Sequence, residues 1–456
     1  MTASTFKTAG RWLALPLAGG AGALAVAVGG WSYEQGLMAG ILVLAAVLWI
    51  TEAVPLFVTA VLVIGAETFL LANPGGWRVF GYTQGGGPTF TSVLNAAISP
   101  ILVLFFAGLV MARAAVKEGV DQALGGWLLR PFVRSRRSLL FGVMGVTALF
   151  SMWMSNTATT AFMLTLTMPL LAQIPPADPF RRALLIAVPF AANIGGLGTP
   201  IASPPNAIAL GYIRQAGESI SFLGWMTAAV PLLLVLLVFL GWLLLKLFPS
   251  PTNAPFSLTL PTIPPTRRSR RVAVIFVVTV LLWLTEGIHG LPAAVVAVLP
   301  VLALLLGGFV QRDDINLLEW DVLILIAGGL ALGYGVGFTG LDHRIVSLLP
   351  SGGGATGLVI VLLAATLALG TLLSNSAVAN LLLPIALAAV AGSGRVTPAL
   401  VAIAFVASLG MALPVSTPPN TMAYARGELR AADMAKAGIP LGLLGLGLVA
   451  GFLLLT

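Results

Sequence analysis

The 456-residue chain contains no cysteine, so it can form no disulfide, thiolate metal site or thiol nucleophile. Charged residues make up only 8% of the chain, whereas soluble domains carry about a quarter. The two histidines are His289 and His343, and no H-E-x-x-H, G-x-S-x-G or P-loop motif is present. These absences argue against a soluble fold, a metalloenzyme, a serine hydrolase and an ATP-driven pump.

Long apolar runs make up most of the sequence, of which 58% is hydrophobic. A run of about 20 apolar residues can cross the hydrocarbon core of a bilayer as a helix. Two stretches, 138–172 and 353–390, are interrupted by polar residues and fit re-entrant hairpins better than full spans. We therefore expect an all-α membrane protein with two re-entrant hairpins and eleven transmembrane helices, at 11–30, 36–52, 54–72, 97–117, 181–212, 222–247, 271–288, 291–310, 321–340, 396–425 and 437–455.

The formal net charge of +8 fits the loop bias of a membrane protein better than a nucleic-acid-binding surface, because basic residues form short clusters beside apolar runs. With the N-terminus in the cytoplasm and both hairpins re-entrant, every basic residue faces inward except Arg78, Arg214, Arg344 and Arg395. A hairpin that crossed fully would invert all later loops. The charge pattern thus predicts a multi-pass inner-membrane protein, surrounded by lipid, with its C-terminus outside.

The sequence divides into two similar halves, separated by a Pro-, Ser- and Thr-rich segment at 248–270 that we interpret as a cytoplasmic linker. Each repeat holds five spans, an odd number, so the second copy is expected to be inverted across the membrane. Inverted repeats with broken helices are typical of secondary transporters. The recurring motifs are Leu-Trp-Ile/Leu-Thr-Glu at 48–52 and 282–286, Ser-Asn-Thr/Ser at 155–157 and 374–376, and Ser/Thr-Pro-Pro-Asn at 203–206 and 417–420.

The polar island at 151–160 predicts the tip of the first hairpin, at Ser155, Asn156 and Thr157. The helix that begins after such a tip presents free N–H groups to an anion, and the last carbonyls of the leg before it favour a cation. Polar residues that merely join packed helices are the alternative. The matching cluster at Ser374, Asn375 and Ser376 makes that alternative less credible.

Glycines and prolines interrupt the predicted spans 181–212 and 396–425 near their middles, at 193–206 and 408–420. Glycine loosens a helix and proline removes a backbone donor, so each span is expected to break there. A structural proline kink is the alternative, although it does not explain a matched pair of double-proline breaks. Broken helices would expose carbonyls to a cation and N–H groups to an anion.

Ionisable side chains are missing from the two tips and the two breaks, and the nearest, Glu52, Glu67, Glu286 and Asp321, lie near predicted span ends. Proton-coupled carriers usually hold an ionisable group within the membrane. Neutral oxygen ligands suit a weakly held hard cation. We therefore expect sodium as the coupling ion and a small anion as the substrate.

At these motifs the sequence resembles the divalent anion:sodium symporter family of dicarboxylate, citrate and sulfate carriers. The resemblance covers nearly the whole chain and is strongest at 49–55, 151–160, 195–206, 320–322 and 374–420. It implies a homodimer that works by an elevator motion. The implied domains are 1–120 and 271–345 as the two scaffold parts, and 138–247 and 353–456 as the two transport parts, each with a hairpin and a broken span.

The resemblance also implies site residues. Two departures occur, because position 376 is Ser where the dicarboxylate pattern has Thr, and Gly370 stands where a hydroxyl would mirror Ser151. The first sodium site would use Ser151, Ser155, Asn156 and the carbonyl of Ala202, and the second Gly370, Leu373, Asn375 and the carbonyl of Ser416. Substrate carboxylates would meet Ser155, Asn156, Thr157, Ser203, Pro204, Ser374, Asn375, Ser376, Thr417 and Pro418.

The sequence therefore favours a secondary transporter that moves succinate-, malate- or fumarate-like di- or tricarboxylates by sodium-coupled symport. A carboxylate exchanger of the same fold and a sodium-coupled carrier of sulfate or another inorganic divalent anion are the alternatives. An anion channel fits less well, because two hairpins that meet at the midplane favour alternating access. An intramembrane enzyme lacks a nucleophile–base pair or metal ligands.

Overall fold

A computed structural model describes residues 3–72, 88–250, 264–348 and 354–455, and within these ranges it contains helices and no strand. The first half contains α1 (Ala3–Ala27), α2 (Tyr33–Thr51), α3 (Leu56–Ala66), the π-helical turn η1 (Glu67–Leu71), α4 (Phe90–Ala97), α5 (Pro100–Lys117), α6 (Val120–Leu129), η3 (Arg130–Phe132), α7 (Arg136–Ser151), α8 (Asn156–Ala172), α9 (Phe180–Gly195), α10 (Pro204–Gln215) and α11 (Phe222–Leu247). The second half contains α12 (Arg267–Leu284), α13 (Glu286–His289), α14 (Ala293–Val296), α15 (Val298–Leu306), α16 (Arg312–Asn316), α17 (Trp320–Thr339), α18 (Leu341–Ser347), α19 (Gly354–Leu372), α20 (Asn375–Val390), α21 (Val396–Leu409), α22 (Pro418–Tyr424) and α23 (Ala431–Leu455).

Seven helices in the described part of the chain are long and apolar enough to cross a membrane. This confirms the membrane class, while the total of eleven spans stays a prediction. The predicted span 291–310 contains two short helices, α14 and α15, and the span 54–72 contains α3 and η1. The seven segments are Lys7–Ala27, Tyr33–Thr51, Phe90–Lys117, Phe222–Leu247, Trp320–Thr339, Gly354–Leu372 and Ala431–Leu454.

Two helix–turn–helix pairs lie where the hairpins are predicted. In the first pair α7 ends at Ser151, and Ser155 starts α8 as its N-cap, with its hydroxyl accepting a hydrogen bond from the N–H of Ala158. In the second pair α19 ends at Leu372 and α20 starts after Ser374. One leg departs from expectation, because α19 is 19 residues long and could cross a bilayer by length alone.

Both predicted helix breaks are present. The first break separates α9, which ends at Gly195, from α10, which starts at Pro204, and the second separates α21, which ends at Leu409, from α22, which starts at Pro418. Proline fits the first turn of a helix because the N–H that it lacks has no intrahelical partner there. The double prolines therefore start α10 and α22 after irregular segments of similar length.

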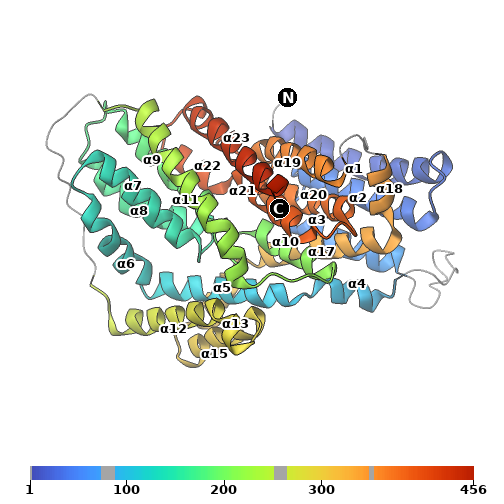
Figure 1. Ribbon diagram of the computed structural model, residues 1–456, viewed down its shortest axis with the longest axis horizontal. Helices are drawn as coiled ribbons and strands as arrows, with labels where there is room; N and C mark the ends of the chain where they lie inside the picture. Colours follow the sequence, from blue (N-terminus) through green and yellow to red (C-terminus); the bar gives the residue numbers. More distant parts are fainter. Residues whose placement is uncertain (1–2, 73–87, 251–263, 349–353, 456) are drawn as a thin grey trace.

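The two halves interlock around the breaks. Helix α10 of the first half packs against α20 and α21 of the second, and α22 packs against α8 and α9 of the first. Helix α17 packs against α3 and also contacts α10 and α20. Figure 1 shows α12 and α15 beside α5 along the lower edge, with α7 to α11 next to α21 to α23 above them. The irregular segments are therefore enclosed by helices from both halves.

The last four residues of the predicted linker 248–270 belong to a helix. Helix α12 begins at Arg267, so the basic run 267–271 forms its first turn, and 251–263 lie outside the described residues. Thr266 caps this helix by accepting from the N–H of Ser269. Arg268 donates to both oxygens of Glu118 and to the carbonyl of Gly308. These bonds explain why the run is ordered as helix.

Candidate substrate site

A cavity of about 330 Å³ lies where the two hairpin tips and the two helix breaks meet. Four helices begin at its wall, and their N-caps are Ser155 (α8), Ser203 (α10), Ser374 (α20) and Thr417 (α22). A helix N-terminus carries unpaired N–H groups and a partial positive charge, both of which favour an anion. The cavity thus combines four helix starts, of which α8 and α20 offer N–H groups in their first turns, whereas the double prolines of α10 and α22 each remove two of these donors. No basic side chain is among the described residues that line it.

All ten predicted substrate-binding residues line this one cavity, including Asn156 and Asn375 from opposite halves of the chain. Of the predicted sodium ligands, Ala202 and Ser416 also line it. Ser151, Gly370 and Leu373 are not among its lining residues. They lie at or next to the C-terminal ends of α7 and α19, the helices that precede the two tips. The structure therefore brings the two tips together, as the proposed anion site requires.

Behind the first tip, three oxygen atoms lie close together. The Ser151 hydroxyl oxygen is 2.7 Å from the carbonyl oxygen of Ala192 and 2.8 Å from Oδ1 of Asn156. The hydroxyl has one hydrogen for two acceptors, so this cluster is rich in oxygen lone pairs. A Cβ on Gly196 would stand 2.5 Å from Oδ1 of Asn156, so a larger residue at 196 would displace this side chain. Such a set of neutral oxygens fits a sodium ion.

The second tip differs because Gly370 supplies no hydroxyl. Oδ1 of Asn375 is buried and has no hydrogen-bond partner among the described residues, whereas Oδ1 of Asn156 accepts a hydrogen bond from the Ser151 hydroxyl. Ser416 donates to the carbonyl of Thr371 at 2.6 Å and accepts from the N–H of Leu413. A buried acceptor without a donor is costly, so Asn375 is available to a cation or to a substrate hydroxyl.

Two asparagines that the sequence marked as part of the repeat, but not as site residues, hold the breaks in shape. Asn206 donates from Nδ2 to the carbonyls of Gly196 and Thr199 at 2.8 Å. Asn420 donates from Nδ2 to the carbonyls of Met411 and Leu413 at 2.7 and 2.9 Å. Each amide replaces helix hydrogen bonds that the break has removed. The position three residues after the N-cap was the available signal.

Replacing Asn206 or Asn420 with Asp should destabilise its break, since a carboxylate cannot donate to two buried carbonyls. We expect each variant to lose about 2 kcal/mol of stability and to be stabilised less by sodium than the wild type. The melting temperature in detergent, with and without sodium, measures both. Thr421→Val, which removes a hydroxyl bonded to the carbonyl of Pro414 at the exposed side of the same helix, is the control. Unchanged melting of both Asp variants would contradict this role.

Two acidic side chains also line the cavity, which corrects the expectation that the site holds no ionisable group. Glu319 precedes α17, and its Oε1 accepts a 2.8 Å hydrogen bond from the Ser155 hydroxyl, while Asp321 lies in the first turn of that helix. The pKa of Glu319 is raised above its ordinary value, chiefly by burial. The hydrogen bond from Ser155 opposes this rise, and the charge of Asp321 adds to it. The sequence placed Asp321 at a span end outside the site, and it gave no signal for Glu319, which 164 positions separate from Ser155.

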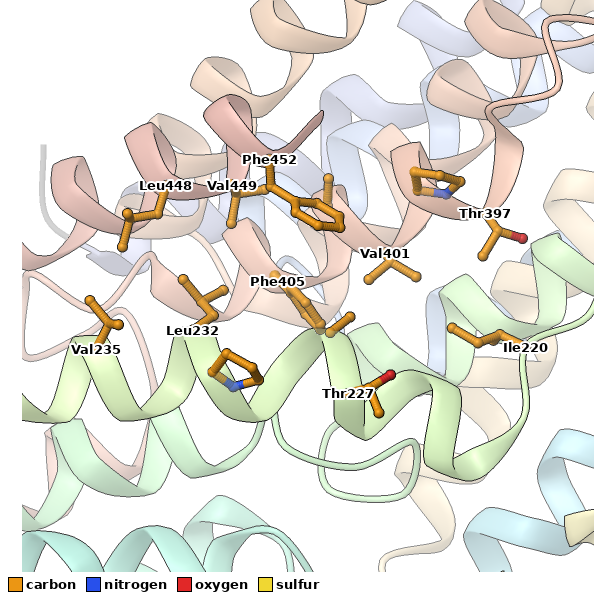
Figure 2. A pocket seen from close by; sticks show the side chains of 14 residues that line it. Ile220, Thr227, Leu232, Val235, Thr397, Val401, Phe405, Leu448, Val449 and Phe452 are labelled. Atoms are coloured by element: carbon orange, nitrogen blue, oxygen red, sulfur yellow. The ribbon is translucent and has the colours of Figure 1, made fainter. Parts of the chain in front are cut away.

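A larger cavity of about 530 Å³ lies between α11, α21 and α23 but has the wrong chemistry for an anion. Figure 2 shows Leu232, Phe405 and Phe452 across its walls. Its two polar side chains, Thr227 and Thr397, already donate to the carbonyl of Gly224 and the carboxylate of Glu218. No charged residue is among the described ones that line it. The cavity between the tips is therefore the candidate site.

Comparison with known proteins matches the citrate transporter family over residues 46–398, more than half of the chain. The chain belongs to this family. The match confirms the resemblance to the divalent anion:sodium symporters that the motifs indicated. This member of the citrate transporter family is therefore a membrane transporter rather than an enzyme. The matched range includes both hairpins and the first helix break.

Relatives of this family member differ in their named substrates. A sodium-dependent dicarboxylate transporter, SdcS of Staphylococcus saprophyticus, is 29% identical over 89% of this chain and 84% of its own length. An uncharacterised transporter of Schizosaccharomyces pombe is 30% identical over 89% of this chain, and the inorganic phosphate transporter PHO87 of Saccharomyces cerevisiae is 27% identical over 83%. This chain spans only 48% and 41% of those two yeast proteins.

Two solved transporters share the fold of this family member. The crystal structure of the Alcanivorax borkumensis YdaH transporter superposes with a TM-score of 0.57 at 14% identity, covering 90% of this chain and 97% of that one. Neisseria gonorrhoeae MtrF gives a TM-score of 0.53 at 13% identity, covering 89% and 94%. The helical architecture is therefore that of known membrane transporters.

Proposed function

We propose that this protein is a secondary transporter that moves small di- or tricarboxylates, such as succinate, malate or fumarate, across the inner membrane by sodium-coupled symport. The observation that carries this proposal is the convergence of four helix N-termini and both Ser-Asn tips on one cavity. Peptide dipoles of this kind attract anions without a fixed positive charge. The name of the SdcS relative supports a dicarboxylate as the substrate.

Sodium coupling follows from the charges in the cavity. Its described lining holds two carboxylates, Glu319 and Asp321, and no basic side chain, so a dianion entering alone would meet net repulsion. Sodium ions held by the oxygens of Ser151, Asn156 and Asn375 would offset that charge. Binding of the anion would therefore depend on binding of sodium, and by linkage the reverse holds as well.

The interlocked unit of α7 to α11 and α19 to α23 would move as one body against α1 to α5 and α12 to α17, the scaffold. Two inverted repeats provide the two equivalent end states of such an elevator motion. The scaffold would form the contact between two copies in a homodimer. The paired bonds of Asn206 and Asn420 to the two breaks support the repeat relation.

Two alternatives keep the same fold and site. An exchanger of one carboxylate for another is favoured by Gly370, which removes a hydroxyl ligand from the second sodium site. An inorganic divalent anion is favoured by the relatives named phosphate transporters, PHO87 and PHO90. Sulfate and phosphate are smaller than succinate and would reach fewer of the lining residues at once.

Uptake by the purified protein in liposomes tests the proposal. We expect labelled succinate to accumulate only with an inward sodium gradient, because the anion needs its counter-ions, and to stay out when choline replaces sodium. Counter-substrate loaded inside the vesicles is the control for exchange, and sulfate and phosphate added as competitors test the inorganic alternative. Sodium-independent uptake would contradict symport, and competition by sulfate or phosphate alone would contradict a carboxylate substrate.

A further inference from the structure

The hydroxyl of Ser155 joins the first hairpin tip to the helix that begins at Trp320. As the N-cap of α8, its oxygen accepts from the N–H of Ala158 at 3.3 Å. Its single hydrogen is donated to Oε1 of Glu319 at 2.8 Å. Glu319 is half-buried between the tip and α17, at the wall of the cavity. The only hydrogen that Ser155 can offer is therefore already in use.

A substrate carboxylate at the first tip would need that same hydrogen. A hydroxyl has one donor, and a bond from it to a carboxylate is charge-assisted and short. Glu319 therefore occupies the position that the proposed function gives to one end of the substrate. It also brings a negative charge, next to Asp321 on the same wall, and no basic side chain among the described lining residues balances the two.

We propose that Glu319 acts as a tethered substitute for a substrate carboxylate and thereby sets the affinity for the substrate at one membrane face. It competes with the substrate for the Ser155 hydroxyl only in the conformation described here. The inference rests on the proposed function, in which Ser155 moves with the hairpin while Glu319 stays with the scaffold. Movement of the hairpin away from α17 breaks the bond and frees the Ser155 hydroxyl. The substrate then binds without a competitor in the other end state.

The competition gives the two membrane faces different affinities. The segment before α17 contains Arg312 and is predicted to be cytoplasmic, so Glu319 meets the tip near the cytoplasmic face. Substrate carried there is displaced by Glu319 and released, whereas substrate arriving from outside binds an open tip. We therefore expect a higher KM for succinate at the cytoplasmic face than at the outer face.

Glu319→Ala and Glu319→Gln, each reconstituted in vesicles of known orientation, test this with succinate uptake measured from each face. Glu319→Ala should lower KM at the cytoplasmic face about tenfold and leave the outer KM within about twofold, as expected for the loss of one charged hydrogen bond. Glu319→Gln keeps an acceptor but not the charge and should give a smaller change in the same direction. Asp321→Asn, which removes a charge from the same scaffold helix without a hydrogen bond to the tip, should lower the cytoplasmic KM by less than Glu319→Ala does.

A purely structural bond predicts a different result, namely a lower kcat or melting temperature with both KM values unchanged. Equal KM changes at the two faces in both Glu319 variants would also overturn the inference. If Glu319→Ala fails to fold, Glu319→Gln decides the matter alone. Wild-type vesicles that take up no succinate would contradict the proposed function, whereas wild-type uptake with unaltered KM values in the variants would contradict the role of Glu319 alone.

Discussion

Sodium-dependent uptake of succinate is expected to fall on the order of 100-fold when Asn156 is replaced by Ala, because a side chain proposed to contact both succinate and sodium is lost. Asn156 is the first residue of α8, lines the cavity and accepts from Ser151 through Oδ1. The thermal stabilisation that succinate and sodium give together should also disappear. Uptake at low substrate concentration and melting curves with each ligand measure the two effects.

Asn375→Ala should lower uptake by a similar factor but cost the unliganded protein less stability. Oδ1 of Asn375 has no partner among the described residues, so no hydrogen bond to that atom is lost, whereas Asn156→Ala leaves Ser151 with one acceptor fewer. The control is Thr165→Ala, which is exposed on α8 and bonds to the carbonyl of Phe162 in its own helix. Normal uptake by Asn156→Ala and Asn375→Ala would place the substrate elsewhere.

Gly410→Ala is expected to cost about 3 kcal/mol of stability and to abolish transport, since backbone cannot move aside as a side chain can. Gly410 directly follows α21 at the second break, and a Cβ there would stand 2.3 Å from the carbonyl carbon of Gly370 and 2.7 Å from its Cα. The added methyl would push α19 away from the break behind Asn375. Melting in detergent and uptake in liposomes measure the two losses.

Two glycines of α19 serve as matched controls. A Cβ on Gly357 meets no atom within 4 Å, so Gly357→Ala should be neutral or stabilise the helix by up to about 1 kcal/mol. A Cβ on Gly370 would lie 3.4 Å from the carbonyl oxygen of Ala407, an ordinary contact, so Gly370→Ala should also fold. A Gly410→Ala protein that melts at the wild-type temperature would show that the close approach is not needed.

The sequence predicted the tips and breaks around the candidate cavity better than it predicted their surroundings. The two tips and two breaks were found because polar, glycine and proline residues interrupt apolar runs at matching places, and those interruptions do mark where helices begin. Glu319 was missed, and Asp321 was placed outside the site, because a position near a span end says nothing about what faces it across the fold. The start of α12 was missed because a basic run is equally compatible with a linker and a capped first turn.

The interlocking of the halves also bears on how the chain is made. Nδ2 of buried Asn193, on α9, donates to Thr417 and to Asn420, which follow it by 224 and 227 positions. At about 5–20 residues per second, synthesis of those partners takes roughly 10 to 45 seconds. During that interval the first hairpin and break stand in the membrane with their polar groups uncovered. These hydrogen bonds can form only after α22 has been synthesised, so completion of the cavity is a late step in assembly.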